Sequence, residues 1–171
     1  MKAQACIRAV LTIVAATGAL MGAAVAPATA AGPQRETFSF TEADTIDCSQ
    51  FNPSWQFHDD FVDFLTIRRS LYVNAAGDVI RIVDHVEHHS NDVNSVTGYT
   101  LHEHDKFRVE YDLLAETATF SGAQGNMQRP GHGSVINYTG HKIFSFSSDV
   151  PIKDAGPNSA DDEDFCRAVA P

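Results

Sequence analysis

Basic residues are scarce in this sequence. Its 171 residues include 12 Lys and Arg but 22 Asp and Glu, so the formal net charge is −10. Two of the basic residues, Lys2 and Arg8, lie in the first thirty positions, which hold no acidic residue; residues 31–171 therefore carry 10 basic against 22 acidic side chains, a net charge of −12. A surface this negative repels phosphate backbones and anionic lipid headgroups. Nucleic acid and membrane surfaces are therefore poor candidates as partners.

The first thirty residues have the anatomy of a secretory signal peptide. Lys2 and Arg8 precede an apolar run over residues 9–26, and Ala28-Thr29-Ala30 supplies the small residues of a cleavage site. We expect cleavage after Ala30 and a secreted, extracellular domain over residues 31–171. The alternative is an uncleaved membrane anchor, because the apolar run approaches the length that spans a bilayer.

Cysteine is also scarce, with three residues in the chain. Cys6 lies in the expected signal peptide, which leaves Cys48 and Cys166. Two cysteines in an oxidising compartment most simply form one disulfide, which ties the start of the fold to its C-terminal tail. Two buried free thiols are the alternative.

Stretches with a helical repeat are missing after residue 31. Apolar and polar residues alternate instead, and turn residues interrupt them at short intervals, as is typical of β-strands. The strands are expected at residues 36–46, 64–73, 78–88, 98–112, 117–122, 134–139 and 141–147, before a polar tail from about residue 149. Seven or eight sequential antiparallel strands predict an all-β fold, a single up-and-down barrel, with a β-sandwich as the alternative.

Charged residues interrupt the apolar face of three of these strands. If the turn at residues 74–77 pairs Val73 with Asp78, alternation carries Arg69, Asp84, Glu103 and Asp105 to the apolar side, with Asp84 opposite Asp105. Buried charges are costly, so this group predicts a matched ionic network or a functional site, in which crowded carboxylates form an acid/base pair. The alternative is a shifted register that leaves all four solvated.

The other face of the same strands is rich in histidine. His102 and His104 point the same way because they are two residues apart, and His85 and Glu87 lie on the neighbouring strand with His89 nearby. Imidazoles beside a carboxylate suit zinc, copper or iron. We therefore treat His85, His102 and His104 as candidate ligands of a transition metal; ordinary surface histidines without a metal are the alternative.

Several short motifs carry a resemblance to known proteins. An Ala-rich signal sequence, the early Cys48 and three turn motifs resemble small secreted bacterial β-barrel proteins of unassigned function; the motifs are Ala76-Gly77-Asp78, Thr97-Gly98 and Pro130-Gly131-His132-Gly133. The general build is similar to the calycin-like barrels, which include the lipocalins and the allene-oxide-cyclase and dirigent group. The resemblance implies a barrel with a lumen, and acidic residues in the lumen of dirigent-like barrels keep Asp84 and Asp105 as candidates.

These observations lead to three hypotheses about a specific site, beside the alternative of a purely structural or interaction module of the cell exterior. The first is a secreted barrel without catalytic activity that binds a small apolar or aromatic ligand, with Tyr99, Phe107 and Tyr111 at the ligand. The second is an isomerase or cyclase that uses Asp84, Asp105 or Glu103, near Arg69, as acid and base. The third is a metal-binding protein that uses the histidines named above; no other cofactor is expected.

Overall fold

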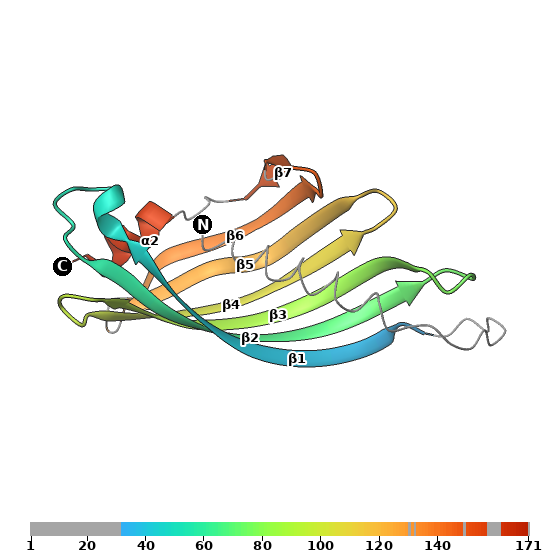
Figure 1. Cartoon of the computed structure of the whole chain (residues 1–171), viewed down its shortest axis with the longest axis horizontal. Helices are drawn as coiled ribbons and strands as arrows, with labels where there is room; N and C mark the ends of the chain where they lie inside the picture. The colour runs from blue at the N-terminus through green and yellow to red at the C-terminus, as the bar shows by residue number, and fades with distance from the viewer. Residues whose placement is uncertain (1–31, 130, 132, 149, 157–161, 171) are drawn as a thin grey trace. The chain divides into compact units, whose positions relative to one another are not determined.

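The computed structural model of the chain describes residues 32–129, 131, 133–148, 150–156 and 162–170. The expected signal peptide lies outside the described residues. Seven antiparallel strands form one sheet, in which each strand pairs with the next along the chain (Figure 1). The strands are β1 (Gln34–Asp47), β2 (His58–Val73), β3 (Val79–Asn94), β4 (Thr100–Asp112), β5 (Thr117–Arg129), β6 (Gly133–Ser145) and β7 (Pro151–Ala155). The predicted all-β class and up-and-down connectivity are confirmed.

The sheet has two edges, β1 and the short β7. Among the described residues no ladder joins these two strands, so the sheet is not closed into the predicted barrel. Several strands run further than expected: β2 begins at His58, β3 continues to Asn94 and β5 continues to Arg129. The strand β6 unites the two segments expected at residues 134–139 and 141–147. No helix in the described part of the chain is long and apolar enough to span a membrane.

The register between β2 and β3 differs from the expected one by two residues. Asp78 belongs to the turn, where the Asn74 amide donates to the Asp78 carbonyl and the Asn74 side chain accepts from the Asp78 amide. Ile80 is the extra residue of a β-bulge, because Val73 pairs with Val79 while the preceding residue of β2 pairs with Arg81. The turn at Asp78 and the bulge at Ile80 each shift the register by one residue. Together they leave the faces of the strands unchanged, so the side chains predicted to point inward do so, although their cross-strand partners differ from the expected ones.

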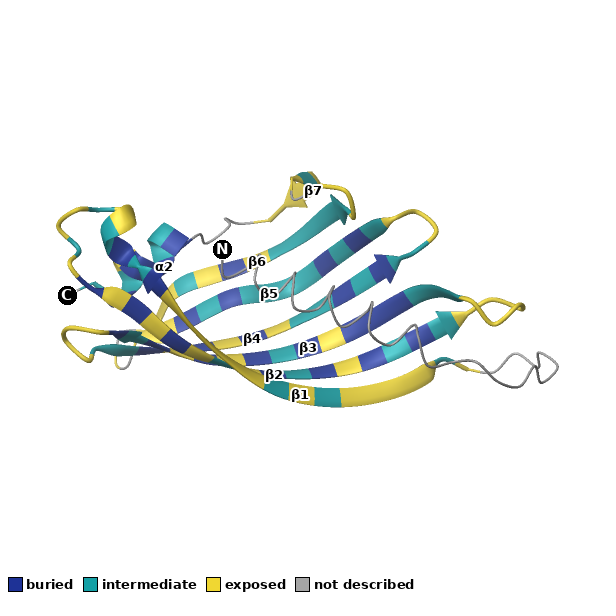
Figure 2. Cartoon of the chain, in the orientation of Figure 1, coloured by how far each residue is buried: buried dark blue, intermediate teal, exposed yellow. Residues whose placement is uncertain are grey.

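Buried and exposed residues alternate along the strands, and Figure 2 shows this alternation most clearly on β2, β3 and β4. We call the face that carries Ile67, Val86 and Val109 the inner face, and the opposite one the outer face. Phe61 and Leu101 belong to the inner face by alternation and pack against the C-terminal helix α2 (Asp162–Val169). The helix therefore covers one end of the inner face.

The predicted disulfide is present between Cys48, in the 3-10 turn η1 (Cys48–Gln50), and Cys166, in α2. It spans a sequence separation of 118 residues. Constraining so long a loop in the unfolded chain contributes about 4–5 kcal/mol in the chain-entropy model. Both cysteines lie in a buried apolar cluster with Ile46, Phe57, Phe61, Leu101, Met127, Phe165 and Val169.

The C-terminal segment is more ordered than a polar tail held by one cysteine. It forms β7 and then α2, whose first turn contains Asp162, Glu163 and Asp164. Acidic side chains at this end of a helix interact favourably with its dipole. At the other end, the buried Asn94 amide group donates to the carbonyl of Val169. The acidic residues therefore form the first turn of α2, and the C-terminal end of this helix is bound to the sheet.

A glycine sets the close approach of β4 and β5. Gly122 has φ +120°, and a Cβ built there would lie 2.7 Å from the Lys106 carbonyl oxygen and 2.9 Å from the Phe107 Cα. The β4–β5 ladder has a register shift beside this point, between Glu103 and Lys106. Gly122 is therefore required both for its backbone conformation and for space.

We expect Gly122→Ala to lower the free energy of unfolding by at least about 2 kcal/mol more than Gly98→Ala, because strained backbone and overpacking add at Gly122. Gly98 is the matched control: its φ is also positive, at +68°, but an added Cβ meets nothing within 4 Å. Urea denaturation of the two variants measures the difference. Equal losses would contradict the packing argument.

Candidate functional site

The inner face combines aromatic side chains with buried charges. Phe38 and Phe40 on β1, Phe107 on β4 and Phe144 on β6 lie at inner-face positions by register and are partly exposed. Fully or nearly buried aliphatic residues lie between them on the central strands, namely Leu65, Ile67, Leu71, Ile82, Val86 and Val109. Two charged clusters interrupt this apolar face.

The first charged cluster is the pair Arg69–Asp84. The two residues are directly opposite each other in the β2–β3 ladder, and their side chains are 2% and 0% exposed. Arg69 Nε donates to Asp84 Oδ1 at 2.9 Å and Arg69 Nη2 donates to Oδ2 at 2.7 Å. The guanidinium also lies 5.2 Å from the ring centroid of Phe38. Both carboxylate oxygens of Asp84 are thus engaged by one arginine.

The second charged cluster is centred on His88. Its Nδ1 lies 3.3 Å from Asp105 Oδ2, and its Nε2 lies 3.1 Å from Asp63 Oδ1. Asp105 also accepts a hydrogen bond of 2.7 Å from the Asn126 amide of β5. Glu103, which is 4% exposed, is close enough for its carboxylate to be grouped with His88 and Asp105. Four neighbouring strands therefore contribute to one buried cluster.

The pKa of His88 reflects two opposing effects. Burial by itself lowers the pKa, but the hydrogen bonds with Asp105 and Asp63 and the charge of Glu103 outweigh burial and raise the pKa from 6.5 to about 10. His88 is therefore an imidazolium at neutral pH, and both of its ring nitrogens are donors.

The observed cross-strand pairs of the charged residues differ from the expected ones. Asp84 faces Val109 on β4 and not Asp105, while Asp105 faces His88. Arg69, Asp84, Glu103 and Asp105 are all buried, so the alternative of four solvated charges is wrong. They are divided between two clusters. The expected alternation already places His88 inside, but the predicted site did not include His88 or Asp63, which complete the second cluster. The position of His88 on the inner face by alternation is the signal for it.

The aromatic candidates are also separated. Tyr111 is buried between Ile82 and Ala118 in the ladders and lies near Arg69, and Phe107 is partly exposed opposite Val86. Tyr99 packs instead against the apolar cluster at α2, beside Arg129. The structure therefore places Phe107 and Tyr111 near the charged inner face, with Tyr99 at its covered end.

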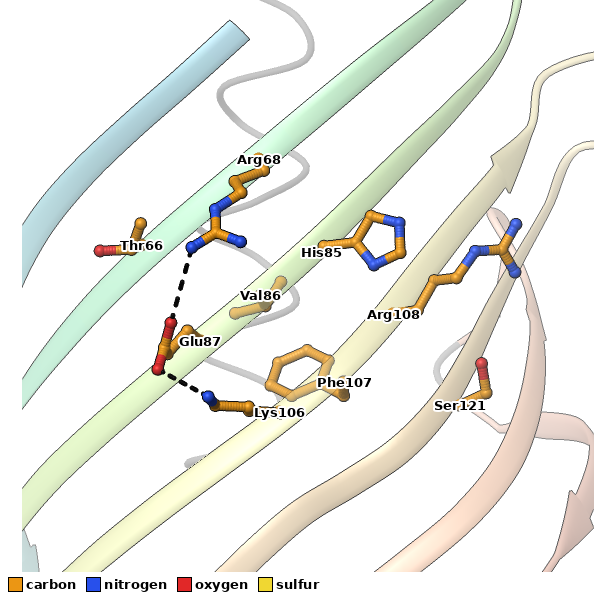
Figure 3. Close-up of a pocket in the computed structure, with 9 residues that line it drawn as sticks. All are labelled: Thr66, Arg68, His85, Val86, Glu87, Lys106, Phe107, Arg108 and Ser121. Atoms are coloured by element: carbon orange, nitrogen blue, oxygen red, sulfur yellow. Dashed lines mark ion pairs between the residues drawn. The ribbon is translucent and has the colours of Figure 1, made fainter. Parts of the chain in front are cut away.

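The outer face carries an open pocket of about 400 Å³ (Figure 3). His85 lies between Arg68 and Arg108, which are its partners in the two ladders. In the next row Glu87 Oε1 lies 3.0 Å from Lys106 Nζ, and Glu87 Oε2 lies 3.9 Å from Arg68 Nη2. The hydrogen bond and charge of Lys106 lower the pKa of Glu87. The pocket is a mixed ionic surface with an excess of basic groups.

The structure does not bring the three candidate metal ligands together. His85 lies in the pocket beside Arg108, and the Nδ1 of His102 is 2.7 Å from the side-chain oxygen of Asn91. His104 is directly opposite His89. The group that converges on the outer face is therefore Glu87, His89 and His104. His89 is at this place because β3 continues past the expected end at residue 88.

A comparison with known proteins found no matching family, no matching curated protein and no matching solved structure. The similarity to calycin-like barrels therefore stays a prediction, and the function has to be argued from the two faces of the sheet.

The raised pKa of His88 predicts a dependence of stability on pH. The unfolded chain releases the His88 proton near pH 6.5 and the folded chain near pH 10, so the stabilisation is complete below pH 6.5 and is lost as the pH rises toward 10. In this window we expect the free energy of unfolding of the wild type to decrease by up to about 1.4 kcal/mol per pH unit more than that of His88→Gln. Urea denaturation between pH 7 and 9 measures the difference between the two proteins.

An NMR titration of the wild-type His88 ring provides the control for this experiment, because it does not depend on the folding of a variant. A midpoint near 6.5, or parallel stability curves for wild type and variant, would contradict the assigned contacts with Asp63 and Asp105.

The Arg69–Asp84 pair predicts strong coupling between two substitutions. Asp84→Leu leaves a buried unpaired guanidinium and Arg69→Met leaves a buried unpaired carboxylate, so each single variant should lose about 3–5 kcal/mol of unfolding free energy. The double variant removes both charges and should lie within about 1 kcal/mol of the wild type, or above it. Urea denaturation of the wild type, the two single variants and the double variant measures the coupling energy. If the losses of the single variants simply add in the double variant, the two side chains do not stabilise each other.

Proposed function

We propose that the protein is a secreted binding protein for a small, mainly apolar or aromatic ligand that is held on the inner face of the sheet. The observation that carries the proposal is the presence of buried ionic clusters within an aromatic and aliphatic surface. A hydrophobic pair of similar volume is generally at least as stable as a buried ion pair, so fold stability alone does not require these charges. Small-molecule sites typically combine an apolar lining with a few fixed polar groups.

The chemistry of the clusters indicates the polar part of the ligand. Around His88 three carboxylates, from Asp63, Glu103 and Asp105, surround one imidazolium. Such a group favours a hydrogen-bond donor, as in a hydroxyl or an amine. The ligand class that fits best is thus an aromatic or alicyclic molecule with one donor group, whose body lies against Phe107 and neighbouring rings.

The same geometry favours binding over acid/base catalysis. A general base works best with a pKa near the working pH, whereas His88 keeps its proton up to about pH 10. Both oxygens of Asp84 accept hydrogen bonds from Arg69, which leaves this carboxylate poorly placed to receive a proton from a substrate.

The secreted location is supported by two observations. The N-terminal residues have the pattern of a signal peptide, and the disulfide is compatible with a non-cytoplasmic location.

Titration with the fluorescent aromatic amine N-phenyl-1-naphthylamine tests the proposal. On protein collected from the culture medium, where the intact mass should correspond to a chain starting at Ala31, we expect saturable fluorescence enhancement at one site. Phe107→Ala should weaken binding by about tenfold, because it removes a partly exposed ring from the inner face.

Arg108→Ala is the matched control, because Arg108 is adjacent in sequence but lies on the outer face, opposite His85. It should bind the probe as the wild type does. Absence of saturable binding, or equal losses in the two variants, would overturn the assignment to the inner face.

A further inference from the structure

Three side chains on the outer face form a compact group that the inner-face function does not use. Glu87 and His89 point to the same side of β3 because they are two residues apart, and His104 is the direct partner of His89 on β4. We propose that Glu87, His89 and His104 bind one divalent transition-metal ion, with Zn²⁺ or Cu²⁺ as the chemical class.

The distances between the ligand atoms are close to those around a metal. Nε2 of His89 and Nε2 of His104 each lie 3.7 Å from the same oxygen, Oε1 of Glu87. All three ligand atoms lie within 4.8 Å of one another. Metal bonds of 2.0–2.1 Å in a tetrahedral site separate neighbouring ligand atoms by about 3.3 Å. Small rotations of the side chains are enough to reach that geometry.

The two imidazole rings are arranged as a pair. Their centroids are 4.2 Å apart with an interplanar angle of 32°, and both nitrogens face one carboxylate. Two nitrogen ligands with one carboxylate oxygen suit zinc or copper, whereas calcium and magnesium prefer oxygen ligands. The histidine side chains are 50% and 47% exposed, so solvent reaches the site and supplies the remaining ligands.

The buried group of His88, Glu103 and Asp105 is a weaker candidate for the same chemistry. A metal ligand needs a free ring nitrogen, and both nitrogens of His88 are held by carboxylates, one from Asp105 and one from Asp63. On the outer face each histidine has its Nε2 directed at the shared oxygen.

A lysine competes with the metal for the shared ligand. Figure 3 shows the ion pair between Lys106 and Glu87, in which Lys106 Nζ is 3.0 Å from Glu87 Oε1. The same oxygen is the one that His89 and His104 face. A metal ion at this oxygen therefore has to displace the ammonium group of Lys106, and the positive charge of the displaced lysine still repels the ion. The site consequently has a feature by which it can be recognised: removal of Lys106 must strengthen metal binding, although Lys106 is not a ligand.

The experiment is calorimetric titration of Zn²⁺ into untagged, metal-free protein, repeated with Cu²⁺. We expect one ion per chain, a loss of affinity of about tenfold or more in His89→Ala and in His104→Ala, and tighter binding in Lys106→Met. His85→Ala and His102→Ala are matched controls, because both histidines lie on the outer face of the same two strands but outside the group.

The outcomes separate clearly. Unchanged binding in the two controls with losses at His89 and His104 supports the site, and a Cu²⁺ EPR spectrum should then show coupling to two nitrogens. Equal losses in all four histidine variants, unchanged binding in His104→Ala, or weaker binding in Lys106→Met would each overturn the proposal. Because the readout is on the outer face, failure here leaves the probe-binding test of the inner face unaffected.

Discussion

The buried ion pair of Arg69 and Asp84 constrains the register of β2 and β3, and the contact between His88 and Asp63 depends on that register. The two residues face each other directly and are nearly inaccessible to solvent. A slip of two residues keeps every side chain on its own face but separates the charges, each then buried without its partner. The register of β3 with β4, which is a separate ladder, brings His88 against Asp105 and His89 against His104. The two registers together determine which charged side chains meet on each face of β3.

The two faces of β3 and β4 use neighbouring residues for different chemistry. His88 points inward, where three carboxylates hold its proton, and His89 points outward, where its ring lies against that of His104. The difference comes from alternation alone, because consecutive residues of a strand point to opposite faces. A strand with histidine at both positions therefore places one histidine ring among buried carboxylates on the inner face and the next ring beside another histidine on the outer face.

Much of the fold could be predicted from the sequence, because period-two alternation and turn residues record strands directly. The inward position of Arg69 and Asp84 was predictable too, since the turn at Asp78 and the bulge at Ile80 each shift the register by one residue and together preserve parity. The actual partners were not predictable, because a bulge has no reliable sequence signature. The outer-face site was predicted at His85, His102 and His104, whereas the histidine opposite His104 is His89, because β3 continues past its expected end at residue 88. The eight-residue α2 is too short for its repeat to be recognised, and its docking depends on a tertiary contact with Asn94.

Because of the disulfide, the stability of the end of the sheet that α2 covers depends on the redox environment. An eight-residue helix is too short to be stable by itself, so α2 relies on its packing and on the covalent link to η1. Under reducing conditions the helix loses that link and the apolar cluster around Phe61 and Leu101 is held by packing alone. While the two cysteines are thiols, this end of the sheet opens more easily, and formation of the disulfide makes the same end more resistant to unfolding.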